Sequence, residues 1–303
     1  MEYVLQTKHL SKKYGKFNAL DNLNMSVPKG SIYGFVGKNG AGKTTLIRTI
    51  CGLQQPSDGS YSLYGINNQD AKITRSRRRM GAVVETPAIY LDMSAEQNLI
   101  EQAILLGLPN FTAIKELLSL VGLADVGKKK VKDYSLGMRQ RLGIAIALVG
   151  DPDFLVLDEP INGLDPQGII DMRELILRLN RERQITILIS SHILDELSRL
   201  ATHYGFIDHG HLIKEIDAAE LERQCRKYVR IEVNDTALLS RVLDLMGIEY
   251  CIHSSTQADI YAKPNVSRLA ATLAKDGCEI ISIQEKDESL ESYFMNLVGG
   301  EEE

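Results

Sequence analysis

The chain has 303 residues, 44% of them hydrophobic and 25% charged, and a formal net charge of -5 at pH 7. These values are typical of a well-cored protein of about two domains, and the acidic balance argues against a nucleic-acid binder that relies on a general basic surface. Four cysteines (Cys51, Cys225, Cys251 and Cys278) show no metal-type or CxxC spacing, and no uncharged apolar run approaches the ~20 residues that cross a bilayer. We therefore expect a soluble, cytoplasmic protein with reduced thiols that reaches a membrane only through a partner.

The first part of the chain alternates strand-like apolar runs with helical patterns. After a mixed β region with a turn at residues 14–16, strand-like runs occur at residues 32–36, 60–64, 154–157 and 185–189. A helix is predicted at 43–51, and this alternation predicts a largely parallel sheet covered by helices. Helical periodicity then extends from 95 to 149, which is too long for a simple crossover. We therefore expect a first domain over residues 1–220 that contains a helical subdomain at about 90–150.

The pattern changes after about residue 220. Predicted elements follow in the order β-α-β-β-α-β with a last helix, at residues 228–233, 236–246, 250–252, 259–261, 266–275, 279–283 and 290–297. This order is typical of a small ferredoxin-like α+β module. We predict such an accessory module over residues 225–303.

A glycine-rich loop follows the strand-like run at 32–36. It matches G-x-x-x-x-G-K-[ST] in full, with the residues Gly37, Lys38, Asn39, Gly40, Ala41, Gly42, Lys43 and Thr44. Glycines let backbone N–H groups close around phosphate oxygens, and the start of the following helix favours negative charge. We expect Lys43 to reach the β- and γ-phosphates, the Thr44 hydroxyl to bind Mg²⁺, and Thr45 to add a phosphate contact. The strand–loop–helix context disfavours a chance turn, although the loop alone indicates only a nucleoside triphosphate.

Two adjacent acids end the apolar run at 154–157. A strand buried on both faces would deliver Asp158 at its carboxyl end, beside the phosphate loop, where ligands collect in open α/β sheets. Asp158 suits Mg²⁺, held directly or through water, and Glu159 suits polarising an attacking water. The alternative, a solvated strand end, is less favoured because the intact loop lies upstream.

Three further segments carry a family resemblance. Residues 134–142 read Tyr-Ser-Leu-Gly-Met-Arg-Gln-Arg-Leu, which resembles the signature segment of ABC ATPases, usually Leu-Ser-Gly-Gly-Gln followed by Gln-Arg. Residues 161–166 (Ile-Asn-Gly-Leu-Asp-Pro) look like the family's D-loop, and residues 190–192 (Ser-Ser-His) look like its switch-histidine segment. The resemblance covers about residues 4–215. It implies an α/β P-loop NTPase fold, a RecA-like core plus antiparallel β and helical ABC subdomains, with ATP and Mg²⁺ clamped in a head-to-tail homodimer.

The resemblance also implies roles for individual residues. Tyr14 matches the aromatic residue that stacks on adenine, and His192 matches the histidine that orients the γ-phosphate and water. Ser135 and Gly137 would contact the γ-phosphate held by the facing subunit, and Asp165 belongs to the D-loop. By themselves, Tyr14 would be an ordinary turn aromatic and His192 a structural histidine.

The sequence departs from the family pattern at two places. The signature has Leu136 and Met138 where Gly and Gln are usual, and Glu85 stands at the usual Q-loop glutamine. A carboxylate at Glu85 can ligate Mg²⁺ or hold water, but it cannot donate hydrogen bonds as an amide does. With the segment around Asp165, both departures look like the subgroup that exports bacitracin and lantibiotic-type peptides.

The leading hypothesis is an ATP-hydrolysing subunit of an ABC exporter that serves peptide-antibiotic or lantibiotic export or resistance. It would act as a homodimer with a separate integral-membrane permease, peripheral at the cytoplasmic face of the cell membrane. The alternative is a non-transport ABC switch acting on the ribosome or DNA, although the acidic balance predicts no nucleic-acid partner. A P-loop kinase would leave the segment Ser135–Arg141 and Asp165 unexplained. The accessory module would stabilise the dimer or sense a ligand, and the transported substrate depends on the permease.

Overall fold

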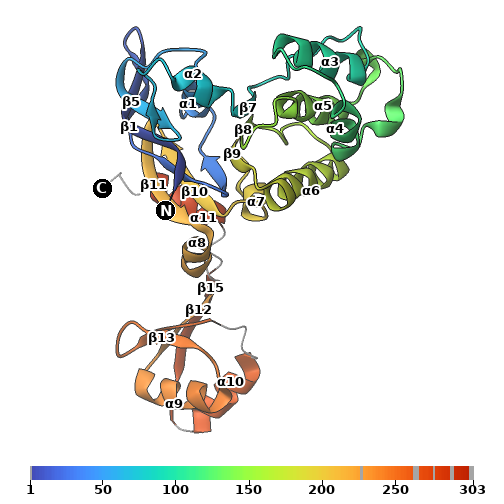
Figure 1. The fold of residues 1–303 in the computed structure, drawn as a ribbon. Coiled ribbons are helices and arrows are strands. Elements are labelled where there is room, and N and C mark those ends of the chain that lie inside the picture. Colours follow the sequence, from blue (N-terminus) through green and yellow to red (C-terminus); the bar gives the residue numbers. More distant parts are fainter. Residues whose placement is uncertain (1, 226–227, 262–265, 276, 287–289, 300–303) are drawn as a thin grey trace. The chain divides into compact units, whose positions relative to one another are not determined.

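The computed structural model describes residues 2–225, 228–261, 266–275, 277–286 and 290–299 (Figure 1). Its contacts divide the chain into two compact units, Met1–Ala218 and Ala219–Glu303. The first unit has two sheets and the second unit has one, and each unit has its own apolar core.

A six-stranded sheet in the order β11-β10-β4-β9-β8-β7 is the centre of the first unit. Its strands are β4 (Ile32–Val36), β7 (Met80–Val83), β8 (Phe154–Asp158), β9 (Thr186–Ser191), β10 (His203–Asp208) and β11 (His211–Asp217). All neighbours pair in parallel except β11, which forms an antiparallel hairpin with β10. Every residue of β4, β8 and β9 is buried, which explains why these strands are continuous apolar runs in the sequence.

An antiparallel sheet packs against this central sheet. Its strands are β1 (Tyr3–Tyr14), β2 (Phe17–Leu23), β3 (Ser26–Pro28), β5 (Asp58–Leu63) and β6 (Ile66–Asn67). One apolar core joins the two sheets, since Leu5 and Leu20 from the antiparallel sheet cluster with Phe35 and Phe154 from the central sheet. The turn between β1 and β2 therefore projects from a rigid base.

Helices complete the first unit. Those outside the predicted helical subdomain are α1 (Lys43–Ile50), α2 (Ile73–Arg77), α6 (Pro166–Arg183) and α7 (Leu194–Ser198). Those within it are α3 (Ala95–Leu105), α4 (Ile114–Leu120), the 3₁₀ turns η1 (Ala124–Val126) and η2 (Val131–Asp133), and α5 (Leu136–Leu148). A capping box formed by Ser94 and Gln97 starts α3. Figure 1 shows α3, α4 and α5 grouped together, away from the antiparallel sheet.

The second unit has the β-α-β-β-α-β order expected from the sequence. Its elements, with the helix leading into it, are α8 (Ala218–Gln224), β12 (Tyr228–Val233), α9 (Thr236–Met246), β13 (Tyr250–Ile252), β14 (Gln257–Ile260), α10 (Val266–Lys275), β15 (Ile280–Lys286) and α11 (Leu290–Gly299). The strands form an antiparallel sheet in the order β13-β14-β12-β15. The ferredoxin-like prediction is confirmed, because this is the order in which two βαβ halves interlock.

A buried carboxylate ties two strands and a loop of this second unit together. Asp259 on β14 is 4% exposed and accepts hydrogen bonds from Arg230 Nε at 2.7 Å and Arg230 Nη2 at 2.9 Å. Nε2 of His253 lies 2.6 Å from the Oδ2 atom of Asp259. Burial alone would raise the pKa of Asp259, but the hydrogen bonds from Arg230 and His253 outweigh burial, and the pKa lies below its ordinary value.

Candidate functional site

The predicted phosphate loop connects the carboxyl end of β4 with the first turn of α1. Gly42 adopts a φ of +114°, and a Cβ there would lie 2.5 Å from the carbonyl oxygen of Ala19. A Cβ on Gly37 would lie 2.5 Å from the carbonyl oxygen of Ile207. Both positions therefore require glycine. Residues 38–40 are exposed between them, where a phosphate chain can approach the backbone.

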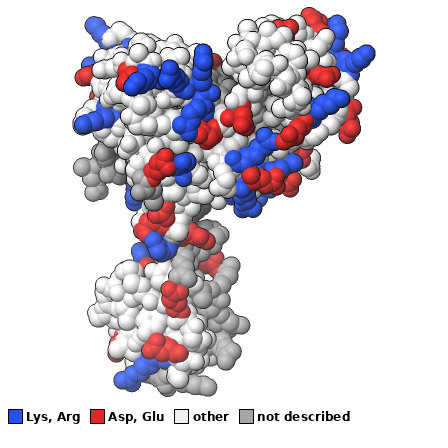
Figure 2. Space-filling view, viewed as in Figure 1, with Lys and Arg blue, Asp and Glu red and all other residues white. Residues whose placement is uncertain are grey.

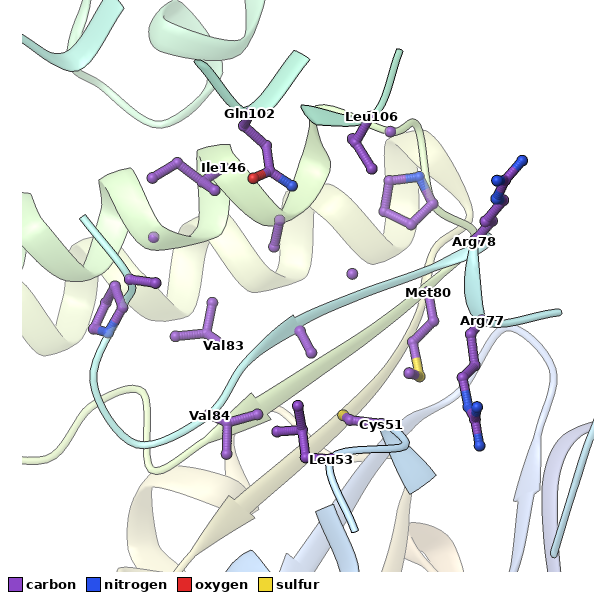
Figure 3. Close-up of a pocket in the computed structure, with 18 of the residues that line it drawn as sticks. Cys51, Leu53, Arg77, Arg78, Met80, Val83, Val84, Gln102, Leu106 and Ile146 are labelled. Carbon is purple, nitrogen blue, oxygen red and sulfur yellow. The ribbon is translucent and has the colours of Figure 1, made fainter. Parts of the chain in front are cut away.

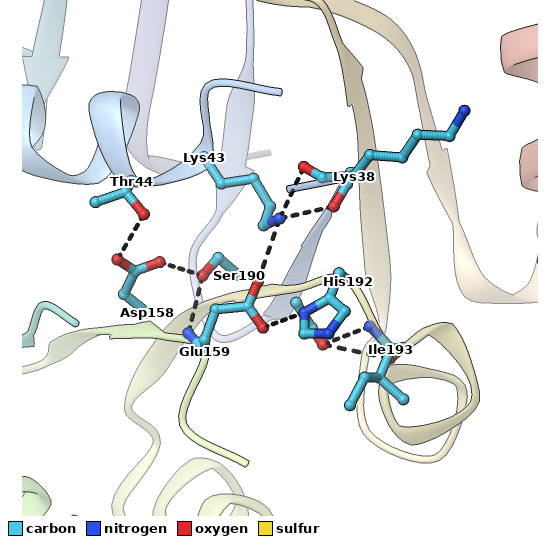
Figure 4. A network of polar contacts seen from close by, with 10 residues as sticks. Lys38, Lys43, Thr44, Asp158, Glu159, Ser190, His192 and Ile193 are labelled. Carbon is cyan, nitrogen blue, oxygen red and sulfur yellow. Dashed lines mark hydrogen bonds and ion pairs between the residues drawn. The ribbon is translucent and has the colours of Figure 1, made fainter. Parts of the chain in front are cut away.

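Lys43 folds back over this loop (Figure 4). Its ammonium group donates to the carbonyl oxygens of Gly37 at 2.6 Å and Lys38 at 3.2 Å. Its Nζ atom also lies 3.2 Å from Oε1 of Glu159, and the side chain is only 6% exposed. The positive charge is thus fixed beside the exposed loop, in a position to bind anionic phosphate oxygens.

Asp158 is held between two hydroxyl groups at the end of β8. The Thr44 hydroxyl donates to its Oδ2 atom at 2.9 Å, and the Ser190 hydroxyl donates to its Oδ1 atom at 2.6 Å. The parallel register of β8 and β9 places Asp158 directly opposite Ser190. The structure thus brings together the two residues that were predicted to bind Mg²⁺ from the loop and from the strand end.

These oxygen atoms suit Mg²⁺. The ion is usually held by one or two protein oxygens together with waters and substrate phosphates, and not by an all-protein cage. Thr44 and Asp158 supply such a pair, and the described part of the chain contains no cluster of three or more His, Cys, Asp or Glu side chains that would compete for a metal. When bound, Mg²⁺ would neutralise charge on the phosphates. Thr44 and Asp158 would hold it.

Glu159 and His192 form the other side of the network. Nδ1 of His192 lies 2.8 Å from Oε2 of Glu159, so that Lys43 and His192 engage separate oxygens of one carboxylate. The backbone of Glu159 has a φ of +50°, in the left-handed region that residues other than glycine adopt uncommonly. A carboxylate held in this way can accept a proton from a water that attacks a phosphate. Lys43, Asp158, Glu159 and His192 are thus held together as a cation, two carboxylates and an imidazole, which are groups that phosphoanhydride hydrolysis could use.

Glu85 lies elsewhere in this structure. Its Oε1 atom accepts from Nη2 of Arg48 on α1 at 2.7 Å, and both side chains are exposed. No hydrogen bond or ion pair links Glu85 to Thr44 or Asp158, whose side chains are described. Its role as an Mg²⁺ ligand stays a prediction, because a carboxylate at this position must first leave Arg48.

A cavity of about 360 Å³ adjoins the loop. Its lining residues from the β1–β2 hairpin are Tyr14, Phe17 and Ala19, and the others are Asn39, Gly40, Gly42, Lys43, Thr44, Thr45, Glu159 and Asn162. Tyr14 is therefore at the same cavity as the phosphate loop, as its predicted contact with adenine requires. Its hydroxyl donates to the side-chain oxygen of Gln54.

Ser135, Gly137 and Asp165 lie outside this cavity. Ser135 caps α5 by accepting from the Met138 N–H at 3.3 Å, and Asp165 caps α6 by accepting from the Gly168 N–H at 3.2 Å. A Cβ on Gly163 would lie 3.3 Å from Leu136, so the predicted signature and D-loop segments of one copy pack together. One copy therefore does not bring Ser135 and Gly137 to its own phosphate loop.

A second, larger cavity of about 640 Å³ lies where β7 meets the helical segment (Figure 3). Most of its lining is apolar, for example Leu53, Val83, Leu106 and Ile146, and Arg77 and Arg78 also border it. Val84, Thr86 and Pro87, the immediate neighbours of Glu85, form part of its wall. This cavity is a candidate surface for a partner protein, since an apolar hollow with a charged border is typical of such sites.

Several contributors were missed in the sequence. Ser190 appeared only as part of the segment around His192, although its hydroxyl also accepts from the Glu159 N–H at 3.0 Å. Phe17, Gln54 and Arg48 belong to no motif that the sequence analysis identified. The register of β8 with β9, the shape of the β1–β2 hairpin and the tertiary contact of α1 place these four residues, and single-sequence patterns do not report these features.

Comparisons with known proteins identify the family of the chain. A family model described as ABC transporter matches residues 20–162. The chain is 41% identical over 305 residues to the bacitracin transport ATP-binding protein BcrA of Bacillus licheniformis, with 99% of each chain covered. It is 44% identical over 219 residues to the lantibiotic transport ATP-binding protein SrtF of Streptococcus pyogenes, covering 72% of this chain and 93% of that one.

A solved structure shows the same similarity. The structure of cbiO1 from Clostridium perfringens, part of the ABC transporter complex cbiONQ, matches with a TM-score of 0.66 and 27% identity over 82% of this chain and 100% of that chain. The predicted family, P-loop fold and ATP-hydrolysing character are thereby confirmed. This chain belongs to the ABC transporter family and is one of its ATP-binding, ATP-hydrolysing subunits.

Proposed function

We propose that this chain drives an exporter by closing and reopening a homodimer around two ATP molecules, in partnership with a separate membrane permease. The observation that carries the proposal is the network of Lys43, Asp158, Glu159 and His192 at the phosphate loop. In it, Lys43 binds the terminal phosphates, Asp158 and Thr44 hold Mg²⁺, and Glu159 takes a proton from the attacking water while His192 orients it.

The homodimer is proposed because no copy has signature residues at its own phosphate loop. Ser135 and Gly137 lie outside the cavity that contains Lys43, so they serve the nucleotide of the facing copy. Moving a dimer from mostly open to mostly closed takes about 5.5 kcal/mol of differential affinity. Several charge-assisted hydrogen bonds to the γ-phosphate, at about 1.5–3 kcal/mol each, are sufficient. Hydrolysis removes these bonds, and the dimer reopens.

The 640 Å³ cavity supports a permease partner. Its apolar wall and the exposed Arg78 at its border suit a short amphipathic helix that carries an acidic residue, whereas the guanidinium group of Arg77 donates to the Tyr61 hydroxyl. Leu106 lines the cavity, whereas its neighbour Leu105 is 71% exposed and does not. Leu106→Glu is expected to abolish co-purification with the co-expressed permease, and Leu105→Glu is the matched control. Equal co-purification of both variants would exclude this cavity as the docking site.

Peptide antibiotics of the bacitracin and lantibiotic type are the proposed substrates. The support is the similarity to BcrA and SrtF, which are named as transport proteins for these compounds. The test is the susceptibility of cells that express this chain together with its permease. We expect resistance to bacitracin or to a lantibiotic with the parent chain and its loss with Glu159→Gln. Susceptibility that is equal in both strains, for every compound of this type, would contradict the proposed substrate class.

The ribosome or DNA alternative has no electrostatic support. The net charge is -5, and on the face drawn in Figure 2 basic and acidic side chains are intermixed. Co-purification of rRNA or DNA with the parent chain, and not with a membrane protein, would favour that alternative.

We also propose the assignment of the two parts of the chain and its location. Residues 1–220 would form the nucleotide-binding domain and residues 225–303 an accessory module. The whole chain would be attached to the cytoplasmic face of the membrane through the permease. Among the described residues, no helix has the length and apolar character needed to cross a bilayer. Cell fractionation with and without the permease tests this location, because the chain should move to the membrane fraction only when the permease is present.

A further inference from the structure

One edge of the sheet in the second unit is exposed. β13 is the outermost strand in the order β13-β14-β12-β15, and in the described ranges β14 is the only strand that pairs with it (Figure 1). Residues 251–255 are all exposed, and Ile252 is 45% exposed. The opposite edge strand, β15, has a register shift where it pairs with Glu232 and Val233, a distortion that disfavours pairing with a further strand. The β13 edge therefore offers a regular strand to a partner.

The hydrogen bonds of this segment show which backbone groups face the exposed edge. The Glu249 carbonyl accepts from the Tyr261 N–H at 3.0 Å, and the His253 N–H donates to β14 at 2.9 Å. In an antiparallel pair, the residues that bond to the neighbouring strand recur at every second position. The backbone N–H and C=O groups of Tyr250 and Ile252 therefore point away from β14, where another strand can bind them.

A second copy of the same segment is complementary to this edge. A two-fold axis at Cys251 would place two copies of β13 antiparallel, with Tyr250 of one copy opposite Ile252 of the other and Glu249 opposite His253. Because side chains alternate along a strand, the apolar pairs lie on one face of the joined sheet and the acid–base pairs lie on the other face. Each contact occurs twice, as a two-fold interface requires.

The charged residues select this register over its neighbours. A two-fold axis at Ile252 would place Glu249 opposite Ser255, and an axis at Tyr250 would place Glu249 opposite Cys251. Both shifts separate the carboxylate from the imidazole of the other copy. Opposite charges on directly opposed residues of two strands stabilise their pairing, so the axis at Cys251 is favoured.

We propose that the second unit is a dimerisation module in which β13 pairs with β13 of a second copy about a two-fold axis at Cys251. The pairing joins two four-stranded sheets into one continuous sheet and covers Ile252. This inference rests on the proposed function, because it adds a contact to the proposed homodimer. The pairing needs no nucleotide, so it keeps two copies at a high effective concentration while the ATP-dependent contacts are open.

Cross-linking of the nucleotide-free full chain tests the register. Opposed residues of a non-hydrogen-bonded antiparallel pair have Cα atoms about 4.5 Å apart, within the range of about 4.4–6.8 Å that a disulfide requires. Diamide takes up the two hydrogens of a thiol pair, and it should convert the parent to a covalent dimer on a non-reducing gel. Cys251→Ser should abolish this dimer although Cys51, Cys225 and Cys278 remain. Adding Ser255→Cys to Cys251→Ser is the matched control and should not restore it, because the proposed register does not place residue 255 opposite itself.

Ile252→Pro tests the hydrogen bonds at the edge. The Ile252 N–H points away from β14, so proline removes a donor from the edge and keeps the bonds between β13 and β14. Two hydrogen bonds would be lost in each dimer. The dissociation constant of the nucleotide-free dimer, measured by analytical ultracentrifugation, should therefore rise about 5- to 150-fold. Ile252→Val keeps the N–H and should associate like the parent, and circular dichroism checks that each variant is folded.

Three results would overturn this assignment: no covalent dimer from the parent, a thiol at residue 255 that links as readily as Cys251, or an unchanged dissociation constant in folded Ile252→Pro. The proposed function is tested separately by the association of Glu159→Gln with Mg²⁺ and ATP. If that variant dimerises with ATP while Cys251 does not cross-link, this inference alone fails. If Cys251 cross-links but the parent chain does not hydrolyse ATP, the proposed function fails and the β13 contact stands.

Discussion

The carboxylate of Glu159 and the ammonium group of Lys43 lie 3.2 Å apart. The residue that would activate water is therefore paired with the cation that would bind the γ-phosphate. When a triphosphate binds, the Lys43 ammonium group would pair with the phosphate oxygens in place of Glu159. The Oε1 atom of Glu159 would then be available for a water molecule, while Oε2 would keep its contact with His192. Nucleotide binding and activation of the base are thus linked by one exchange of partners.

Replacing Glu159 by Gln should separate binding from hydrolysis. The amide keeps the shape of the side chain but cannot take a proton, so turnover should fall by about 100- to 10,000-fold. ATP affinity should stay equal or increase, because Lys43 loses a competing anion. Turnover is measured by phosphate release, and ATP-dependent dimerisation by size-exclusion chromatography. Turnover at the parent rate would remove Glu159 from the mechanism.

Replacing Lys43 by Ala should weaken the binding of ATP itself. The ammonium group is the buried cation of the loop, and its hydrogen bonds to a phosphate are charge-assisted. Losing one or two such bonds, at about 1.5–3 kcal/mol each, should weaken ATP binding by at least tenfold. Titration with a fluorescent ATP analogue measures this, and Lys38→Ala, at an exposed loop position, is the comparison. If the Lys43 variant bound and hydrolysed ATP like the parent, the whole site would be assigned wrongly.

Ser190 should control the Mg²⁺ requirement. Its hydroxyl donates to Asp158 and accepts from the Glu159 N–H, so Ser190→Ala removes a hydrogen-bond partner of the buried Asp158 Oδ1 atom, whereas the Glu159 N–H keeps the Ser190 carbonyl oxygen at 3.2 Å. We expect a loss of about 1–3 kcal/mol in the free energy of unfolding and a higher Mg²⁺ concentration for half-maximal activity. Ser191→Ala, at a buried serine bonded to the Ile193 N–H, should leave the Mg²⁺ requirement unchanged. An equal Mg²⁺ response in both variants would show that Ser190 does not position Asp158.

Substitutions of Arg48 and of Glu85 should shift the Mg²⁺ concentration for half-maximal activity in opposite directions. Their ion pair is exposed and contributes only about 0.2–1 kcal/mol, so either substitution should change Tm little. If Glu85 ligates Mg²⁺, Arg48→Gln frees the carboxylate and lowers the Mg²⁺ concentration for half-maximal activity, whereas Glu85→Ala raises it. Shifts of the same sign in both variants would indicate that the ion pair itself, and not the released carboxylate, matters.

The second unit should lose stability in acid through Asp259. Its pKa in the folded chain lies below the ordinary value of 3.8, so this carboxylate stabilises the fold above that value and ceases to do so as the pH falls below it. Asp259→Asn should destabilise the unit by about 1–3 kcal/mol at pH 7 and flatten the dependence of Tm on pH below about 4. Asp244→Asn, at an exposed carboxylate of α9, is the control. The same acid dependence in both variants would contradict the role of Asp259.

The sequence was most informative where spacing along the chain determines chemistry. The phosphate loop places Lys43 and Thr44 by local geometry alone, and the apolar run before Asp158 predicts a buried strand end. The strands and helices of the second unit were predicted almost to the residue at Tyr228–Val233 and Thr236–Met246, because their periodicity is regular.

Other parts of the site depend on tertiary structure. Ser190 faces Asp158 only because β8 and β9 are in register, and Phe17 joins Tyr14 only because a tight turn separates them. The partner of Glu85 is Arg48, thirty-seven residues away in sequence. Ser135 and Gly137 depend on a second copy of the chain, which no pattern within one sequence can place.

The packing of Leu136 beside Gly163 has a consequence for how two nucleotides would influence each other. The segment that we propose to contact the facing copy's ATP packs against the loop that follows Glu159 in its own copy. When one ATP is hydrolysed, the Ser135 segment that contacts it would move away. Because this segment packs against the loop after Glu159 in its own copy, the same movement would displace residues near the other ATP. The two sites of the proposed dimer would then be joined by this packing, in which Leu136 lies beside Gly163 and Leu164 beside Gly137, so that a movement at one nucleotide would reach the other.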